Sequence, residues 1–208
     1  MTPGRFGDRR RVRVGLLGGS FNPAHAGHLH VARMARRALG LDQVWLMVSP
    51  GNPLKPARGM APLAERLASA RRIADGRRVI ATDIERALGT RYTADTLRLL
   101  HGRFPRVRFT LVIGADNLVQ LPRWQDWRRI ARGTALAVLP RPGWTRRALA
   151  GQAACVLRPH RRAPGALLEE GFAPHAPWCL VPAREHAASA TAIRRARAED
   201  DTGERRGP

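Results

Sequence analysis

Apolar runs of strand length alternate with apolar side chains at helical spacing in the first quarter of this chain. Residues 12–17 are mostly apolar and predict a buried strand. Between residues 31 and 39 the apolar side chains recur at helical spacing, which predicts one face of a helix that stops at Gly40. Residues 43–48 predict a second strand. A strand, a helix and a strand in this order predict a right-handed parallel unit.

The same alternation continues through the rest of the chain. Four more apolar runs predict strands, at residues 79–81, 109–113, 135–139 and 178–181. Three helices are expected in this part of the chain. One starts at Pro62, the next has Thr93 as its N-cap, and the third runs from Pro122 to Ile130. A weaker pattern at residues 144–177 predicts mostly loop and short helix. Together these elements predict an α/β fold, a Rossmann-like, doubly wound parallel sheet with flanking helices in a single domain.

The length and the cysteine content fit one cytoplasmic domain. In this chain of 208 residues we expect the domain to span residues 12–197, with residues 1–11 and 198–208 as disordered tails. No run is long and apolar enough to cross a membrane, and the basic start is not followed by the apolar region of a signal peptide. Cys155 and Cys179 are isolated, without disulfide or metal-ligand spacing, which favours a reducing cytoplasm.

The net charge of +21 does not by itself predict nucleic-acid binding. The basic side chains are spread along the whole chain without interleaved aromatic residues, and every one of them except Lys55 is arginine. Many arginines and alanines beside a single lysine are typical of a bias towards GC-rich codons. The charge would nevertheless favour any polyanionic ligand.

The turn between the first strand and the first helix carries the candidate chemistry. It reads Gly-Gly-Ser-Phe-Asn-Pro-Ala-His-Ala-Gly-His over residues 18–28. Gly18 and Gly19 have no Cβ, so backbone N–H groups there can approach an anion closely. His25 and His28 are three positions apart, so both can project from one side of the first helical turn, at the positive end of the helix dipole. These features predict a polyphosphate site at the carboxyl end of the first strand, where open α/β sheets bind ligands.

Each feature of this turn has a simpler explanation when it is taken alone. A glycine-rich turn between a strand and a helix is common, and a single histidine is more often structural than functional. The turn lacks the Gly-Lys-Ser/Thr of a Walker A loop, and its glycines do not have the G-x-G-x-x-G spacing. As a whole, the motif resembles the signature of the nucleotidylyltransferases, which join a nucleotide to a phosphate acceptor. That family more usually has Thr and Asp where this chain has Ser20 and Asn22.

The resemblance implies an ATP site that draws on three parts of the chain. Its second signature, Ser-Ser/Ala-Thr-x-Ile-Arg, is similar to residues 189–194, which taken alone are more often a plain capped helix start. After the strand at 109–113, Asp116 can accept a hydrogen bond from a ribose, cap a helix, or do both. The residues that the resemblance assigns to ATP are Gly18, Gly19, Ser20, Phe21, His25, His28, Gly114, Asp116, Ser189, Thr191 and Arg194.

The proline-rich loop at residues 49–56 contains the only lysine of the chain. A compact ammonium can contact one phosphate oxygen where a planar guanidinium does not fit, although a solvated loop lysine is an equally simple explanation. The resemblance favours a phosphate role for Lys55 and assigns both Asn52 and Lys55 to binding of the acceptor. Leu54 stands where the family commonly has His.

Two segments further along the chain are candidates for binding the acceptor. The family has Ser-Tyr-Thr where this chain has Arg91, Tyr92 and Thr93, which implies contact with the acceptor mononucleotide, whereas capping and packing also account for these residues. Of Trp124 and Trp127, one is expected in the core and the other can stack on an aromatic ring. The resemblance points to Trp124 as the platform for a pyridine ring.

The reaction that the resemblance implies is adenylyl transfer from ATP to nicotinate mononucleotide, which gives deamido-NAD and pyrophosphate in NAD biosynthesis. The catalytic residues expected for it are His25, His28, Lys55 and Arg194. No metal-ligand cluster is evident, so Mg²⁺ is expected to be bound mainly through ATP. No nucleic-acid or membrane partner is expected, and the sequence does not define an oligomeric state.

Other functions stay open at this point. Nicotinamide mononucleotide or phosphopantetheine can be the acceptor, although Tyr92 and Trp124 favour a pyridine ring over pantetheine. Outside this chemistry, the alternative is an Arg-rich nucleic-acid-binding protein that keeps the α/β fold.

Overall fold

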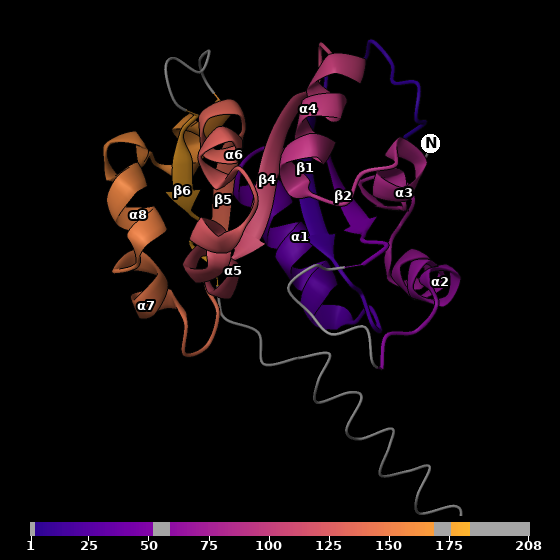
Figure 1. The fold of residues 1–208 in the computed structure, drawn as a ribbon, viewed down its shortest axis with the longest axis horizontal. Helices are drawn as coiled ribbons and strands as arrows, with labels where there is room; N and C mark the ends of the chain where they lie inside the picture. The colour runs from indigo at the N-terminus through magenta and orange to yellow at the C-terminus, as the bar shows by residue number, and fades with distance from the viewer. Residues whose placement is uncertain (1–2, 52–58, 169–175, 184–208) are drawn as a thin grey trace, which may run out of the picture.

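A single parallel sheet forms the centre of the molecule in the computed structural model, which describes residues 3–51, 59–168 and 176–183. Its strands are β1 (Arg13–Gly19), β2 (Gln43–Val48), β3 (Val79–Thr82), β4 (Arg108–Gly114), β5 (Ala135–Leu139) and β6 (Trp178–Leu180). All neighbours pair in parallel, in the order β3-β2-β1-β4-β5-β6 (Figure 1). The strand order changes direction between β1 and β4, which confirms the expected doubly wound sheet and places its topological switch point there.

Alternate residues of the central strands face opposite sides of the sheet, and both sides are buried. In β2, Trp45 and Met47 belong to one apolar cluster, whereas Leu46 and Val48 belong to the other. The two-residue period of a strand produces this division. It also explains why these strands are continuous apolar runs in the sequence rather than alternating ones.

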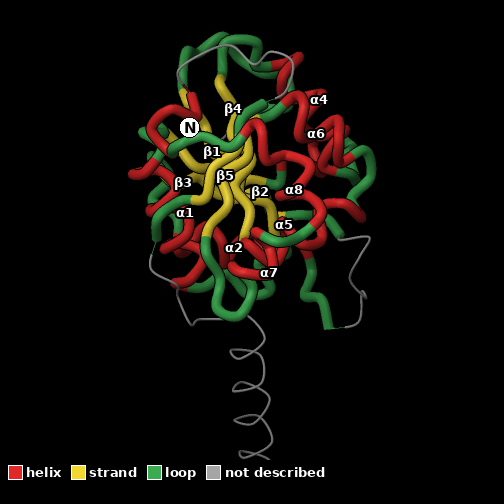
Figure 2. Tube along the Cα trace, turned by 90° about the vertical axis from the view of Figure 1, so that its left-hand side faces the viewer, coloured by secondary structure: helices red, strands yellow, loops and turns green. Residues whose placement is uncertain are grey.

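Helices cover both faces of the sheet, and Figure 2 shows the strands enclosed among them. One apolar cluster packs beneath α1 (Ala26–Ala38) and α2 (Leu63–Ile73). The other cluster packs beneath α3 (Ile84–Leu88), α4 (Thr93–Arg103), α5 (Ala115–Gln120), α6 (Trp127–Gly133), α7 (Thr145–Leu149) and α8 (Gln152–Leu157). Short 3₁₀ turns occupy Leu121–Arg123, Arg158–His160 and Pro164–Leu168. The short helices α7 and α8 confirm the expected loop and short helix between residues 144 and 168.

The start of α4 differs from the sequence prediction. Thr93 is the first helical residue rather than the N-cap, and the cap position belongs to Tyr92, which makes no side-chain capping bond. Tyr92 has the extended backbone (φ −112°, ψ 140°) that an N-cap residue adopts, so the helix begins one residue earlier than expected. By contrast, Gly40 has a φ of +60° directly after α1, which confirms it as the residue that ends this helix.

The prediction of a single helix from Pro122 to Ile130 is also wrong. A 3₁₀ turn ends at Arg123, Asp126 takes a φ of 51°, and α6 begins only at Trp127. Aspartate is one of the few residues that adopt this left-handed conformation readily, so the chain can break there. The break separates Trp124 from Trp127.

No helix of the described residues is long and apolar enough to cross a membrane. The expected domain limits at residues 12 and 197 and the expected tails stay predictions.

Candidate active site

The loop after β1 has a tight and unusual backbone. Phe21 has a φ of 48°, which is rare for a residue with a bulky side chain. A Cβ on Gly19 would lie 3.2 Å from the Phe21 ring, so glycine permits the ring to fold back over the end of the strand. Phe21 is thereby fully buried, and its ring centroid lies 4.8 Å from that of His28. This close packing explains why the chain has a Gly-Gly pair followed by an aromatic residue at this point.

The two histidines meet at the start of α1, as the spacing predicts. Their ring centroids are 3.8 Å apart, with His25 buried at the N-cap position and His28 half-buried as the third residue of the helix. Nδ1 of His25 accepts the N–H of Gly27 at 3.1 Å, and Nδ1 of His28 accepts the N–H of His25 at 3.2 Å. Because both Nδ1 atoms are acceptors, each neutral ring carries its proton on Nε2. Both rings therefore present an N–H donor at Nε2. Phosphate oxygens accept hydrogen bonds from donors of this kind.

A cavity at the carboxyl edge of the sheet joins segments that are distant in sequence. Its lining includes Gly18, Gly19 and Ser20 from the loop after β1, and Ser49 and Gly51 from the loop after β2. From the segments that follow β3 and β4 it is lined by Glu85, Arg91, Tyr92, Thr93, Asn117, Gln120, Arg123, Trp124 and Gln125. The structure thus brings the predicted phosphate-binding glycines to one cavity with three of the predicted acceptor residues, Tyr92, Thr93 and Trp124. His25 and His28 lie outside its lining.

The two tryptophans of the segment after Pro122 have different surroundings. Trp127 is 7 % exposed and belongs to the core, whereas Trp124 is half-buried and lines the cavity. This arrangement matches the expected division between one core tryptophan and one that can stack on a ligand. Its cause is the backbone break at Asp126, which the sequence pattern did not reveal.

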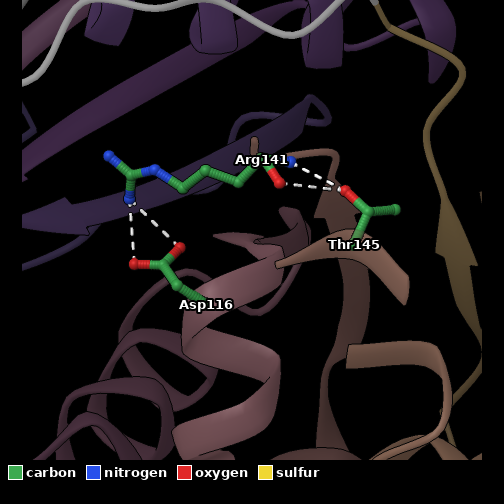
Figure 3. Close-up of polar contacts among 3 residues, drawn as sticks. All are labelled: Asp116, Arg141 and Thr145. Atoms are coloured by element: carbon green, nitrogen blue, oxygen red, sulfur yellow. Dashed lines mark hydrogen bonds and ion pairs between the residues drawn. The ribbon is translucent and has the colours of Figure 1, made fainter. Parts of the chain in front are cut away.

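Asp116 is held by an arginine that the sequence analysis did not assign to the site. Nη1 of Arg141 donates to both carboxylate oxygens of Asp116, at 3.1 and 2.9 Å (Figure 3). The backbone N–H of Arg141 in turn donates to Oγ1 of Thr145 at 3.0 Å. A Cβ on Gly114 would lie 2.5 Å from Oδ1 of Asp116, so a larger residue there would require this carboxylate to shift. The pair lies where β4 and β5 end, beside the cavity but outside its lining; the expected bond from Asp116 to a ribose stays a prediction.

Glu85 is a buried carboxyl group in the wall of the cavity, and sequence reasoning gave it no role. Desolvation raises the pKa of Glu85 to about 7, although a 3.4 Å hydrogen bond from Oγ1 of Thr96 acts in the opposite direction. Thr96 is itself bonded to Thr90 at 2.8 Å, so the carboxyl group sits in a small hydroxyl network. At neutral pH this side of the cavity therefore carries less negative charge than the sequence suggests.

Replacing Glu85 with glutamine is expected to make stability less dependent on pH. In the folded parent the carboxyl group keeps a proton that the unfolded chain releases above its ordinary pKa near 4.3. The free energy of unfolding of the parent should therefore fall as the pH rises towards and through 7, by up to about 3 kcal/mol. Urea unfolding at pH 5 and pH 8 measures this fall, which the Glu85→Gln variant should lack. The exposed Glu65→Gln variant is the control, and identical pH dependence in parent and Glu85→Gln would contradict the prediction.

Several predicted site residues lie outside the described residues. They are Asn52 and Lys55, with the neighbouring Leu54, and Ser189, Thr191 and Arg194 of the second signature. Their roles stay predictions. Among the described residues, no group of three or more His, Cys, Asp or Glu side chains is arranged to hold a metal ion.

Comparison with known proteins gives a consistent picture. Residues 16–196 match the cytidylyltransferase-like family. The probable nicotinate-nucleotide adenylyltransferase of Gluconobacter oxydans is 59 % identical over 187 residues, which cover 88 % of this chain and 94 % of that protein. The protein of the same name from Gluconacetobacter diazotrophicus is 56 % identical over 193 residues, which cover 91 % of this chain and 88 % of that protein.

Among solved structures, the nicotinic acid mononucleotide adenylyltransferase of Plasmodium falciparum has the same fold. Its complex with NaAD has a TM-score of 0.64 at 14 % identity, covering 88 % of this chain and 83 % of that chain. Its complex with APC has a TM-score of 0.62 at 13 % identity, with the same coverage. At such low identity the likeness supports the fold alone.

Proposed function

The chain belongs to the cytidylyltransferase-like family and, within it, to the nicotinate-nucleotide adenylyltransferases, and from this premise we propose that it makes deamido-NAD from ATP and nicotinate mononucleotide. An oxygen of the mononucleotide's phosphate attacks the α-phosphorus of ATP, the bond from that phosphorus to the β-phosphoryl oxygen breaks, and pyrophosphate leaves. The observation that carries the proposal is the cavity that runs from the glycines after β1 to Tyr92 and Trp124. It offers one binding region for phosphates and another for a flat ring.

On the phosphate side, the chain supplies hydrogen-bond donors and positive charge rather than a general base. The second pKa of a phosphate monoester is about 6, so the attacking oxygen is already ionised at neutral pH. Catalysis then consists of positioning the two phosphates and stabilising the charge that shifts between them. Nε2 of His25 and of His28 would donate to the reacting phosphates, while Lys55 and Arg194 would neutralise the departing pyrophosphate.

On the acceptor side, the proposal assigns the pyridine ring to the face of Trp124 and its carboxylate to the segment around Tyr92 and Thr93. Arg91 and Arg123 also line the cavity, so cations are available to an anionic substituent. Glu85, whose pKa is raised to about 7, adds only part of an opposing charge at neutral pH. These charges favour the acid mononucleotide over nicotinamide mononucleotide, because an amide carries no charge and presents an NH₂ group to the same donors.

A divalent metal ion fits this site mainly through the nucleotide. Glu85, with a pKa raised to about 7, is only partly ionised at neutral pH, and the carboxylate of Asp116 is paired with Arg141, so neither offers a strong ligand among the described residues. Mg²⁺ keeps several waters and commonly binds through substrate phosphates. When bound with ATP it would neutralise charge on the triphosphate, and the chain's own donors would orient the oxygens that remain.

The proposal extends to the setting of the reaction. The catalytic domain would span residues 12–197 and work in the cytoplasm on ATP and nicotinate mononucleotide, without a nucleic-acid or membrane partner. The distribution of arginine along the whole chain supports this more than it supports nucleic-acid binding.

The purified protein is expected to release pyrophosphate from ATP only when a pyridine mononucleotide is present. The assay couples pyrophosphate release to chromatographic identification of the second product, with nicotinate mononucleotide, nicotinamide mononucleotide and phosphopantetheine each offered in turn. Deamido-NAD should form in amounts equal to pyrophosphate. Release with phosphopantetheine alone would give the chain a different acceptor. A salt-sensitive shift of a DNA or RNA probe, without any pyrophosphate release, would favour nucleic-acid binding instead.

A further inference from the structure

Helix α2 carries a buried arginine beneath the loops of the candidate active site. Arg66 is only 3 % exposed, and burial lowers the pKa of its guanidinium. It stays charged nonetheless, because an arginine pKa begins above about 12. Among the ion pairs of the described residues, none involves Arg66. A buried cation is tolerated only when its donors are satisfied, so its hydrogen bonds account for its position.

The guanidinium of Arg66 donates to four backbone carbonyl oxygens from three segments. Nε donates to Ala61 at 2.8 Å, just before α2. Nη1 donates both to Ser20, in the loop after β1, at 2.8 Å and to Ser49, in the loop after β2, at 2.7 Å. Nη2 donates to Pro50 at 3.3 Å. One side chain thus joins the two loops whose residues line the phosphate end of the cavity.

These bonds also fix the direction of backbone N–H groups in both loops. Within a planar trans peptide, the C=O group and the following N–H group point in opposite directions. Because the carbonyl groups of Ser20 and Pro50 point towards Arg66, the N–H groups of Phe21 and Gly51 point away from α2. Gly51 belongs to the lining of the cavity. Backbone N–H groups of this kind are the donors that phosphate sites use.

Two further side chains join the loop after β1 to α2 and to the segment just before it. Oγ of Ser69, one turn after Arg66, accepts the N–H of Ala24 at 3.1 Å. The amide of Asn22 donates to the carbonyl oxygen of Gly59 at 2.8 Å and accepts the N–H of Ala61 at 3.2 Å. An ionised aspartate could not donate to Gly59, which explains how asparagine fits this position. The loop after β1 is therefore hydrogen-bonded both to α2 and to the segment just before it, and Arg66 supplies the charged donor among these bonds.

We propose that Arg66 is a positioning residue for adenylyl transfer, which holds the loops after β1 and β2 in the arrangement that binds the ATP phosphates. This inference rests on the proposed function. The planar fork of a guanidinium can reach carbonyl groups on both loops at once, whereas the single ammonium of lysine cannot reproduce that geometry. The charge contributes as well, because a buried cation with only carbonyl partners adds a positive potential beneath the phosphate-binding loops.

The test compares Arg66→Lys and Arg66→Gln with Arg72→Gln, a control on the exposed part of the same helix. Three quantities are measured for each folded protein: the Tm, the Kd for ATP without acceptor, and kcat with both substrates. Arg66→Gln should weaken ATP binding and lower kcat, each by roughly tenfold, since a misplacement of about 1 Å costs up to 10²-fold in rate. Arg66→Lys should remain folded and still lose much of its affinity for ATP and of its kcat. Arg72→Gln should match the parent in both quantities.

Three results would overturn the inference. Parent-like Kd and kcat in Arg66→Lys would show that the guanidinium fork is not required. A lower Tm with unchanged Kd and kcat would assign Arg66 to stability alone, and so would the unfolding of both Arg66 variants. Failure of the proposed function appears differently, because the parent itself would then release no pyrophosphate with ATP and nicotinate mononucleotide, while the Kd comparison would still report on Arg66.

Discussion

Replacing His28 with alanine is expected to lower kcat by roughly 10²-fold or more, the usual loss when one transition-state donor is removed. The reason is the position of its proton. Nδ1 of His28 accepts the backbone N–H of His25 at 3.2 Å, so the neutral ring donates from Nε2 at the start of α1. Charge moves onto the pyrophosphate as the reaction proceeds, and a donor held in place beforehand stabilises that charge more than it stabilises bound ATP. The KM for ATP should therefore change less than kcat does.

An asparagine at position 28 separates this catalytic effect from a loss of helix capping. The side-chain oxygen of asparagine can accept the N–H of His25 in place of Nδ1, but asparagine has no group at the position of Nε2. His28→Asn should thus keep the parent's Tm and show the same loss of kcat as His28→Ala. His30→Ala, two residues along the same helix, is the matched control and should retain the parent's kcat. A folded His28→Ala protein with near-normal kcat would remove His28 from the mechanism.

Replacing Trp124 with alanine is expected to raise the KM for the mononucleotide roughly ten- to hundredfold while leaving the KM for ATP nearly unchanged. Trp124 is half-buried in the cavity wall, on the opposite side of the switch point from the loop after β1. A stacked ring contributes on the order of 1 kcal/mol beyond the burial of its apolar surface, and the alanine variant loses both contributions. Initial-rate measurements with each substrate varied in turn give the two KM values.

Two other substitutions test whether the change in the mononucleotide KM depends on an aromatic side chain at position 124. Trp124→Phe keeps an aromatic face and should recover much of the affinity for the mononucleotide. Trp144→Ala removes a tryptophan that is 36 % exposed and outside the cavity lining, and it should leave both KM values as in the parent. An unchanged mononucleotide KM in folded Trp124→Ala would show that this ring does not contact the acceptor.

The sequence was sufficient to predict the sheet and the histidine pair because both depend on short-range patterns. Buried parallel strands require continuous apolar runs, so β1, β2, β4 and β5 could be located from the pattern of apolar residues alone. Likewise, the contact between His25 and His28 follows from three-residue spacing at the start of a helix. The prediction that one of the two tryptophans lies in the core was correct, although the backbone break that separates them depends on the φ of a single residue, Asp126.

The sequence could not reveal contacts that join distant segments. In an arginine-rich chain nothing distinguishes Arg66, which is buried, from its exposed neighbours Arg71 and Arg72 on the same helix. The pair between Asp116 and Arg141 joins the ends of two adjacent strands 25 positions apart, and their parallel register is known only from the fold. Glu85 is similar, because its raised pKa results from burial rather than from any local motif.

The most direct test of adenylyl transfer to an acid acceptor is a competition between the two pyridine mononucleotides. The parent protein is incubated with ATP, Mg²⁺ and equal, limiting concentrations of nicotinate mononucleotide and nicotinamide mononucleotide, and the initial rates of deamido-NAD and NAD formation are measured in the same tube. Their ratio equals the ratio of the two kcat/KM values. We expect deamido-NAD to form at least roughly tenfold faster, which is a difference of about 1.4 kcal/mol in transition-state binding. Equal rates, or faster formation of NAD, would contradict the assignment of nicotinate mononucleotide as the acceptor.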